Sequence, residues 1–263
     1  MTMNTIRIGI STIVYHWKTG SPDGATALKG LAELGFKQVE YSDLSRPYVH
    51  EDREHELIQL RTQAEAWGIK IAAAHIPPLD DAGLEKTVGI IKTSINSAGV
   101  LGAEFVILHP GWIGDSTSRN DSIPEICERA REKKMKILLE NMPAPSQFDL
   151  KSIVAIIKDC NDDVLGICLD VGHSWLSNVN PAEDIKKAGR FLSCLHLHDN
   201  DRSADQHLIP FEGSIPWHDV AAALKETDFQ GLVTLECHSS LQYSQQSVIA
   251  AQAKSVVEEL LKN

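Results

Sequence analysis

The sequence predicts an α/β protein built as one closed (β/α)₈ barrel, and the first observation behind this is an alternation of two kinds of segment. Short runs rich in β-branched and apolar residues alternate with longer amphipathic stretches along the whole chain, as in a parallel sheet whose strands are joined by helices. Eight such runs are expected to be strands, the number that closes this type of barrel. They are Ile6–Thr12, Gln38–Ser42, Lys70–His75, Phe105–His109, Lys136–Asn141, Leu165–Asp170, Leu192–His196 and Leu232–Glu236.

The second observation is the size and uniformity of the chain. Its 263 residues suit a barrel that folds as one unit, and 43% of them are hydrophobic, enough for a large buried core. No linker, low-complexity tract or abrupt change of composition divides the sequence. We therefore expect a single domain over residues 1–263.

Helix signals fall between the expected strands. Asp23 is a capping residue ahead of an amphipathic stretch. Ser122 with Pro124, and Asn180 with Pro181, each combine a capping side chain with a proline suited to the first helical turn. A helix is therefore expected to start at each of these places.

The longest stretch without a helix or strand pattern runs from about Asp199 to Pro216. It follows the seventh expected strand, at the end of the barrel where the active sites of such barrels lie. Connections of this length inside a compact domain are often functional. We therefore expect this loop to border the site.

Charge and cysteine content narrow the classes of partner. The formal net charge of −11 repels a phosphate backbone, so broad nucleic-acid binding is not expected and a small substrate fits better. The five cysteines are odd in number and widely spaced, unlike a secreted disulfide framework. The chain shows no signal-peptide pattern and no apolar run of membrane-spanning length. We expect a soluble, cytoplasmic protein without a membrane partner.

Acidic and imidazole side chains stand at the ends of successive expected strands. Because strand side chains alternate, Leu138 shares a face with Glu140 and Cys168 shares a face with Asp170, so the polar members can point into the barrel mouth. Carboxylates that meet there would repel one another unless a cation lay among them. The strand ends concerned carry His75, His109, Glu140, Asp170, His196 and Glu236.

This ligand chemistry predicts a divalent metal ion. Mixed imidazole and carboxylate ligands suit Zn²⁺ or Mn²⁺ first, with Co²⁺, Fe²⁺ or Mg²⁺ as alternatives, and disfavour Ca²⁺. No glycine-rich loop of the P-loop or dinucleotide type occurs in the sequence, so a nucleotide cofactor is not expected.

The chain resembles the sugar phosphate isomerase/epimerase branch of the xylose-isomerase-like TIM barrels, also called the AP endonuclease family 2 superfamily. The resemblance spans nearly the whole chain and is specific in ILLENMP, CLDVGHSWL, CLHLHDNDR with DQHLIPFEGSIPW, and LVTLEC. In the epimerases of this group it implies substrate contacts at His173 and Arg202. It implies metal ligands at Glu140, Asp170, His196 and Glu236.

The same superfamily contains endonuclease IV, which holds three zinc ions. The resemblance implies that its additional ligands match His75, His109, His173, Asp205 and His207, and all are present. The chain departs from that enzyme in lacking basic loops after the strands, where Lys18, Arg119 and Arg202 are the obvious cations. A phosphodiesterase that acts at abasic DNA is therefore the second hypothesis.

The first hypothesis is an isomerase or epimerase acting on a sugar or sugar phosphate through a metal-stabilised enediolate. Glu140 and Glu236 are the expected catalytic proton carriers on the two sides of the substrate. Transfer between opposite faces gives epimerisation, transfer between adjacent carbons gives isomerisation, and loss of a β-hydroxyl gives dehydration, so all three outcomes stay open. A catalytically silent barrel that binds sugar is a further alternative.

The remaining residues of interest frame this site. Trp17 and Trp112 follow strands and are expected either to contact substrate or to pack their loops. Cys168 and Cys194 are expected to fill the barrel interior beneath the metal. Barrels of this resemblance are often dimers or tetramers, so a homo-oligomer is an additional expectation. No role is assigned to a further set of histidines, which are expected to be ordinary surface or loop residues: His16, His50, His55, His218 and His238.

Overall fold

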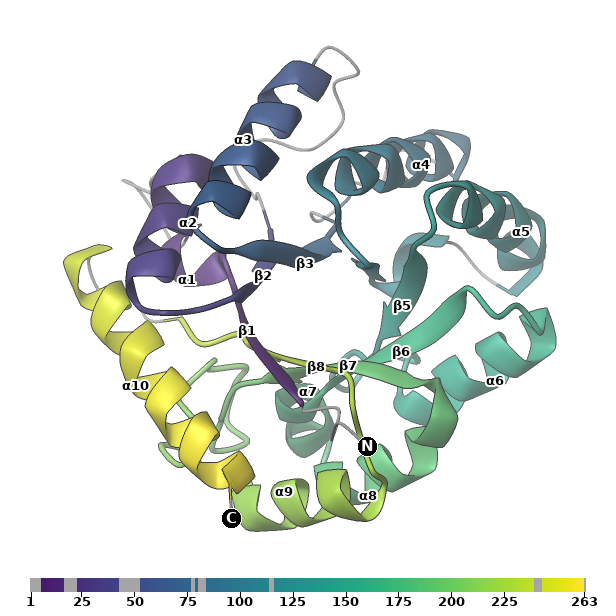
Figure 1. The fold of residues 1–263 in the computed structure, drawn as a ribbon. Helices are drawn as coiled ribbons and strands as arrows, with labels where there is room; N and C mark the ends of the chain where they lie inside the picture. The colour runs from purple at the N-terminus through teal and green to yellow at the C-terminus, as the bar shows by residue number, and fades with distance from the viewer. Residues whose placement is uncertain are drawn as a thin grey trace.

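Eight parallel strands form a closed barrel in which chain order and spatial order agree (Figure 1). The computed structural model describes residues 6–16, 23–42, 53–76, 79, 84–113, 116–238 and 243–262. Every expected strand is present, with ends that differ by one residue at most, so the predicted barrel is confirmed. The strands are β1 (Arg7–Ser11), β2 (Gln38–Tyr41), β3 (Lys70–His75), β4 (Phe105–Leu108), β5 (Lys136–Glu140), β6 (Leu165–Asp170), β7 (Leu192–Leu197) and β8 (Leu232–Leu235).

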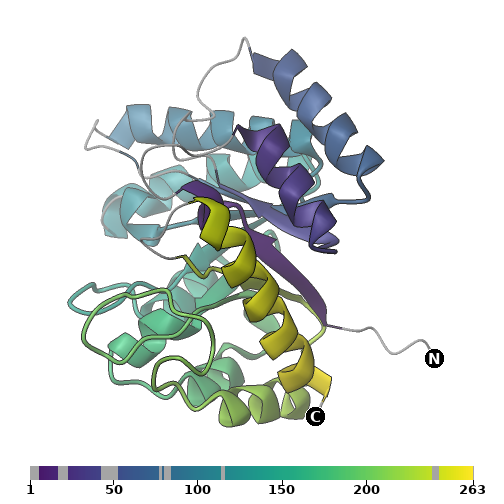
Figure 2. The same ribbon diagram turned by 90° about the vertical axis from the view of Figure 1, so that its left-hand side faces the viewer.

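Helices surround the barrel and cover the outer faces of the strands (Figures 1 and 2). None of the described helices has both the length and the apolar character needed to cross a membrane. The helices are α1 (Ile13–His16), α2 (Gly24–Glu33), α3 (Glu54–Ala66), α4 (Leu84–Leu101), α5 (Ser116–Glu132), α6 (Leu150–Cys160), α7 (Val171–Leu176), α8 (Pro181–Ala188), α9 (Trp217–Glu226) and α10 (Tyr243–Lys262).

Two of the three expected helix starts are confirmed. The side chain of Asp23 accepts a hydrogen bond from the backbone N–H of Thr26 at 2.9 Å, which caps α2. Asn180 caps α8 by accepting from the backbone N–H of Ala182 at 3.0 Å, and Pro181 occupies the first turn. Both caps satisfy backbone donors that have no partner inside the helix.

The start predicted at Ser122 is wrong, because α5 already begins at Ser116 and Pro124 lies inside it. Proline removes one backbone N–H donor and crowds the preceding turn, which normally ends a helix. Here Ile123 and Ile126 on either side of Pro124 are buried in the core. We attribute the continuous helix to this packing, which outweighs the local cost of the proline.

The barrel interior is a small apolar core of its own. It consists of short or branched side chains from six of the strands, β3 to β8, which pack together beneath the carboxyl ends. Cys168 and Cys194 belong to this layer and are fully buried, as expected. The layer contains Ala72, Ala73, Ile107, Leu138, Cys168, Cys194 and Leu232.

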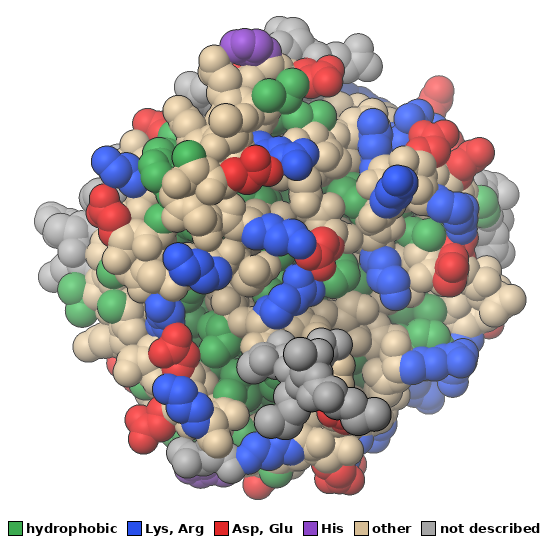
Figure 3. Space-filling model, viewed as in Figure 1, with side chains coloured by type: hydrophobic (Ala, Val, Ile, Leu, Met, Phe, Trp, Pro, Cys, Tyr) green, Lys and Arg blue, Asp and Glu red, His purple; other side chains and the backbone are tan. Residues whose placement is uncertain are grey.

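An ion-pair network lies at the end of the barrel where the strands begin. Glu104 accepts from Nη1 of Arg7 at 2.9 Å and also pairs with Lys70. The face shown in Figure 3 carries Lys and Arg side chains interspersed with Asp and Glu, without a large area of one sign. The surface at this end of the barrel therefore carries charges of both signs.

The long connection between β7 and α9 lies at the opposite end of the barrel from the start of the chain (Figure 2). Asp199 organises it by accepting from Nε1 of Trp217 at 2.7 Å and from the backbone N–H groups of Phe211 and Ile215 at 2.9 and 3.2 Å. A single antiparallel bridge joins Asp199 to Leu208. The expected loop is thus present, and it is held by one buried carboxylate.

Candidate metal centre and active site

Four acidic and imidazole side chains meet at the carboxyl ends of the last four strands. Glu140 ends β5, Asp170 ends β6, His196 lies near the end of β7, and Glu236 follows β8. One ligand atom from each lies within 4.8 Å of the others. The convergence that the sequence predicts is therefore present in the structure, while the role of these residues as metal ligands stays a prediction.

His196 is at the centre of this group. Its Nδ1 atom is 3.1 Å from Oε1 of Glu140, 3.4 Å from Oε2 of Glu236 and 3.8 Å from Oδ2 of Asp170. Burial opposes charging of the ring, but the carboxylates led by Glu236 overcome it and raise the pKa of His196 well above its usual value. So many carboxylates around one buried nitrogen require a positive charge, either a proton or a metal ion.

A second group adjoins the first through Glu140. Nε2 of His75 and Nε2 of His109 lie 3.0 and 3.1 Å from its Oε2 atom, on the side of the carboxylate away from His196. Burial opposes ionisation of Glu140, yet His196 and His109 together lower its pKa well below the usual range. Burial also opposes charging of His75, and Glu140 raises the pKa of this ring to about 9.

A third group lies on the loop side of the mouth, where Asp205 contacts two imidazoles. Its Oδ2 atom is 3.2 Å from Nε2 of His173 and 3.3 Å from Nε2 of His207. Burial lowers the tendency of both rings to charge, but Asp170 and Asp205 raise the pKa of His173 to about 10. Asp205 likewise raises the pKa of His207 to about 9. All nine residues predicted as metal ligands thus fall into three adjoining groups.

Two residues at the centre of the site were missed by the sequence analysis. His198 is fully buried, and its Nε2 atom lies 3.0 Å from both oxygens of Asp170. Glu40 of β2 is fully buried as well, and its Oε2 atom lies 3.0 Å from Nε2 of His196. The signal for His198 was available, because it is two residues after His196 on the same face.

His238 also lies closer to the site than expected. Its ring stacks on that of His207, with ring centres 4.3 Å apart, and the ring of His198 also stacks on His207, with ring centres 3.9 Å apart. Burial lowers the pKa of His238 to about 3, so this ring is neutral. His238 therefore extends the imidazole-lined wall, whereas His55 and His218 are exposed as expected.

The residues expected to contact substrate lie at different places. The guanidinium of Arg202 lies 3.5 Å over the ring of Trp175 and donates to Oδ1 of Asn178 at 3.2 Å, so it is on the rim and outside the three groups. Trp112 stacks on His109 with ring centres 4.3 Å apart, which places it beside the second group. Outside the described residues or side chains are Trp17, Lys18, Arg119, His16 and His50.

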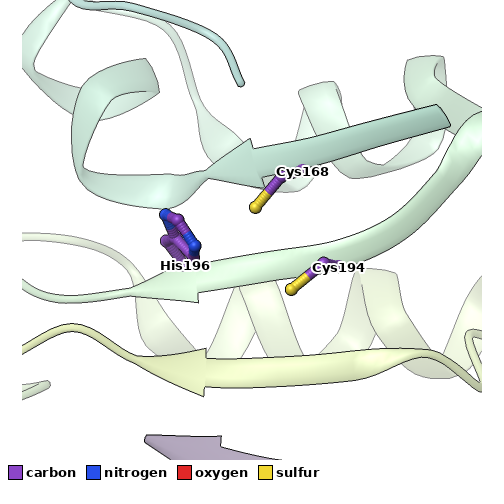
Figure 4. A group of neighbouring side chains, drawn as sticks. All are labelled: Cys168, Cys194 and His196. Carbon is purple, nitrogen blue, oxygen red and sulfur yellow. The ribbon is translucent and has the colours of Figure 1, made fainter. Parts of the chain in front are cut away.

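Two thiols form the floor beneath His196 (Figure 4). Sγ of Cys168 and Sγ of Cys194 lie within 4.8 Å of each other and of an imidazole nitrogen of His196. Burial, followed by the neighbouring Cys194, raises the pKa of Cys168 well above its usual value. A neutral thiol is a poor metal ligand and both ring nitrogens of His196 face carboxylates, so we assign these cysteines to packing.

The amino-acid sequence is similar to those of other proteins over most of its length. An uncharacterized protein of Methanocaldococcus jannaschii is 30% identical over 254 residues, covering 88% of this chain and 83% of the relative. A D-psicose 3-epimerase of Enterocloster bolteae is 24% identical over 244 residues, covering 84% of this chain and 79% of that enzyme.

Solved structures show the same fold. A D-tagatose 3-epimerase-like protein superposes with a TM-score of 0.77 at 26% identity, covering 98% of this chain and 97% of the other. A D-psicose 3-epimerase crystallised in the presence of D-fructose superposes with a TM-score of 0.80 at 17% identity, covering 98% and 100%. Residues 28–260 match the family described as xylose isomerase-like TIM barrel, and the chain belongs to this family.

Proposed function

We propose that this protein is a divalent-metal-dependent isomerase or epimerase of a small sugar or sugar phosphate. The observation that carries the proposal is the meeting of three carboxylates and one imidazole, all buried, at the carboxyl ends of neighbouring strands. The relatives support a carbohydrate substrate, since they include D-psicose 3-epimerases and fructoselysine 3-epimerases. The proposed ligands are Glu140, Asp170, His196 and Glu236.

The chemistry of the donor set fits a divalent cation. Three carboxylates and one nitrogen match Mn²⁺ or Zn²⁺ better than Ca²⁺, which prefers oxygen alone. The excess of negative charge around Nδ1 of His196 would be neutralised by such an ion. When bound, the ion would polarise a sugar carbonyl and its neighbouring hydroxyl and disperse the charge that develops as a proton leaves.

Glu140 and Glu236 are the proposed proton carriers, and they reach the centre from strands separated by β6 and β7. Burial opposes ionisation of Glu140, but the adjacent imidazoles lower its pKa, which favours the carboxylate that accepts a proton. Burial raises the pKa of Glu236 against the effect of His196 and His207, so in the metal-free site Glu236 holds a proton more readily than Glu140 does. Such a division of pKa values between two carboxyl groups is typical of acid–base pairs. Donation from the opposite side would invert the carbon.

Proton exchange with solvent tests the proposal directly. The Mn²⁺-loaded protein is incubated in deuterated water with D-psicose, D-fructose or D-tagatose, and the position of deuterium is read by NMR. We expect deuterium at C3 together with interconversion of C3 epimers, and loss of about 100-fold or more of the rate in Glu140→Gln and Glu236→Gln. Exposed His218 provides the control variant His218→Ala, which should keep full activity.

The site of exchange decides among the reaction types. Deuterium at C1 with formation of an aldose would assign the protein to the isomerases. Exchange at no carbon of these ketoses or of their phosphates, by a protein that retains its metal, would refute the proposed reaction and leave a sugar-binding barrel. Full activity of Glu140→Gln would show that Glu140 is not a proton carrier.

The second candidate is a multi-zinc phosphodiesterase like endonuclease IV. It is favoured by one observation, that two further groups of donors adjoin the first, His75 with His109 on Glu140 and Asp205 with His173 and His207. Metal analysis of the purified protein and incubation with a duplex containing an abasic site distinguish the two. About three zinc ions per chain with strand incision would establish the phosphodiesterase, whereas incision should be absent if the proposed isomerase or epimerase is correct.

A further inference from the structure

Glu40 makes a contact across the barrel that the proposed reaction does not use. It lies near the end of β2, which is separated from β7 by β1 and β8 in the closed sheet. Its Oε2 atom is 3.0 Å from Nε2 of His196, and both side chains are 0% exposed. The other oxygen, Oε1, is buried without a hydrogen-bond partner among the described residues. A buried carboxylate is costly unless it is paired, and in the part of the chain that the structure describes Glu40 pairs with His196.

This contact determines which nitrogen of His196 carries a proton. An ionised carboxylate only accepts hydrogen bonds, so Nε2 of His196 must donate to Glu40. In the neutral ring the lone pair then resides on Nδ1, the atom that faces Glu140 and Glu236. If Glu40 were absent, the ring could instead place its proton on Nδ1 and donate it to Glu140, which is 3.1 Å away. That tautomer would block the nitrogen from a cation.

We propose that Glu40 is a positioning residue that holds His196 in the Nε2–H tautomer and thereby presents Nδ1 to the metal ion. The inference rests on the proposed function, because it takes His196 as a ligand. Glu40 is not itself a proton carrier for the substrate, since it is fully enclosed and lies on the side of the imidazole away from Glu140 and Glu236. A carboxylate behind a metal-binding imidazole also makes that imidazole a stronger ligand.

Cobalt titration of the full-length protein tests this role without relying on turnover. Binding is followed by the visible absorption of Co²⁺ in chelator-treated wild-type protein and in variants. Glu40→Ala should weaken Co²⁺ binding by about 10–100-fold, the usual effect of removing such a partner. Glu40→Gln should weaken it less, because the amide oxygen can still accept from Nε2. Glu104→Ala, which removes a carboxylate at the other end of the barrel, should bind Co²⁺ like the wild type.

A further variant separates failure of the inference from failure of the proposed function. If His196→Gln binds Co²⁺ as tightly as the wild type, the proposed metal site is wrong and the role of Glu40 falls with it. If His196→Gln weakens binding and Glu40→Ala does not, the metal site stands and only the role of Glu40 is overturned.

Nitrogen NMR of the His196 ring in the zinc-loaded wild-type protein provides a measurement that needs no variant to fold. The inference expects a proton on Nε2 and the signature of a metal-bound nitrogen on Nδ1. The reverse assignment would overturn it. Thermal unfolding of Glu40→Ala and Glu40→Gln shows whether each is folded before its Co²⁺ affinity is compared with that of the wild type.

Discussion

Nε2 of His198 lies 3.0 Å from each carboxylate oxygen of Asp170, and both side chains are fully buried. Because the N–H of His198 contacts both oxygens, it restricts rotation of the Asp170 carboxylate about its last side-chain bond. The backbone N–H of His173 adds a contact of 2.7 Å to Oδ1. Two hydrogen-bond donors therefore fix the orientation of the Asp170 carboxylate at the barrel mouth.

We predict that His198→Ala weakens binding of Mn²⁺ or Co²⁺ by about 10–100-fold, because Asp170 loses the group that orients it. Calorimetric titration of the chelator-treated protein measures this change. The exposed His55 provides the matched control, and His55→Ala should leave the affinity unchanged. Equal affinities of His198→Ala and wild type would show that Asp170 is oriented by other contacts or is not a ligand.

Gly172 is required for the position of His198. A methyl group at this residue would lie 2.1 Å from Cε1 of His198, and that ring is enclosed and cannot turn away freely. We predict that Gly172→Ala lowers the free energy of unfolding by about 1–3 kcal/mol, as overpacking of an enclosed site does, and also weakens metal binding. Urea unfolding measures the first effect and calorimetry the second.

The control for this prediction is Gly89 in α4, where an added methyl group meets no atom within 4 Å. Gly89→Ala should raise the free energy of unfolding by up to about 1 kcal/mol, since alanine favours helices over glycine. If Gly172→Ala kept the stability and metal affinity of the wild type, the backbone at residue 172 would be able to shift at little cost. The close approach of Gly172 to His198 would then not matter for metal binding.

Asp199 is predicted to hold the loop that carries Asp205 and His207. Nε1 of Trp217 and the backbone N–H of Ile215 donate to different carboxylate oxygens of Asp199. Asp199→Asn replaces one of these oxygens by an N–H₂ group, which cannot accept a hydrogen bond, so one of the two bonds is lost. We expect the free energy of unfolding to fall by about 1–3 kcal/mol, the effect of leaving a buried hydrogen-bond donor without its acceptor. Hydrogen exchange should also quicken in residues 199–216. Exchange and stability like those of the wild type would contradict this account.

The barrel could be predicted from the sequence because its strands are short, apolar and regularly spaced. Runs such as Lys70–His75 and Leu165–Asp170 carry a strand pattern that owes little to distant residues. Closed parallel strands share one active end, so the ligand candidates at strand ends could be placed together before any geometry was known. The start of α5 could not be placed, because the burial of Ile123 and Ile126 that carries the helix past Pro124 is a tertiary effect.

The supporting residues of the site were harder to predict than the ligand candidates. Glu40 stands in the short run QVEY, where a glutamate alone reads as a solvent-facing residue, and its partner His196 is 156 positions further along the chain. Only closure of the barrel brings them together. The spacing of His198 from His196 could have identified it as a site residue. Its contact with Asp170 could not be predicted, because the sequence does not give the distance between these two side chains. The sequence pattern therefore predicts which side chains lie at the strand ends, but not which of them make hydrogen bonds across the barrel.

The metal-free protein is predicted to lose stability as the pH rises above neutrality. Asp170 and Asp205 raise the pKa of His173 to about 10, and Glu140 raises the pKa of His75 to about 9, although burial opposes both. An unfolded histidine has a pKa of about 6.5. The folded state therefore holds protons that the unfolded state releases, so this stabilisation is complete below about pH 6.5 and disappears as the pH rises through 9 to 10.

Urea unfolding in the presence of a chelator, at about pH 6.5 and about pH 9.5, measures this loss. The midpoint should be lower at the higher pH, and His75→Gln should show a smaller fall, whereas the exposed-site variant His55→Gln should fall as the wild type does. Excess Mn²⁺ should suppress the fall, because a cation among the carboxylates replaces the positive charge of the protons. A midpoint that stays level or rises between the two pH values without metal would show that these imidazoles are not protonated in the folded protein, and that the carboxylates of the mouth are neutralised in another way.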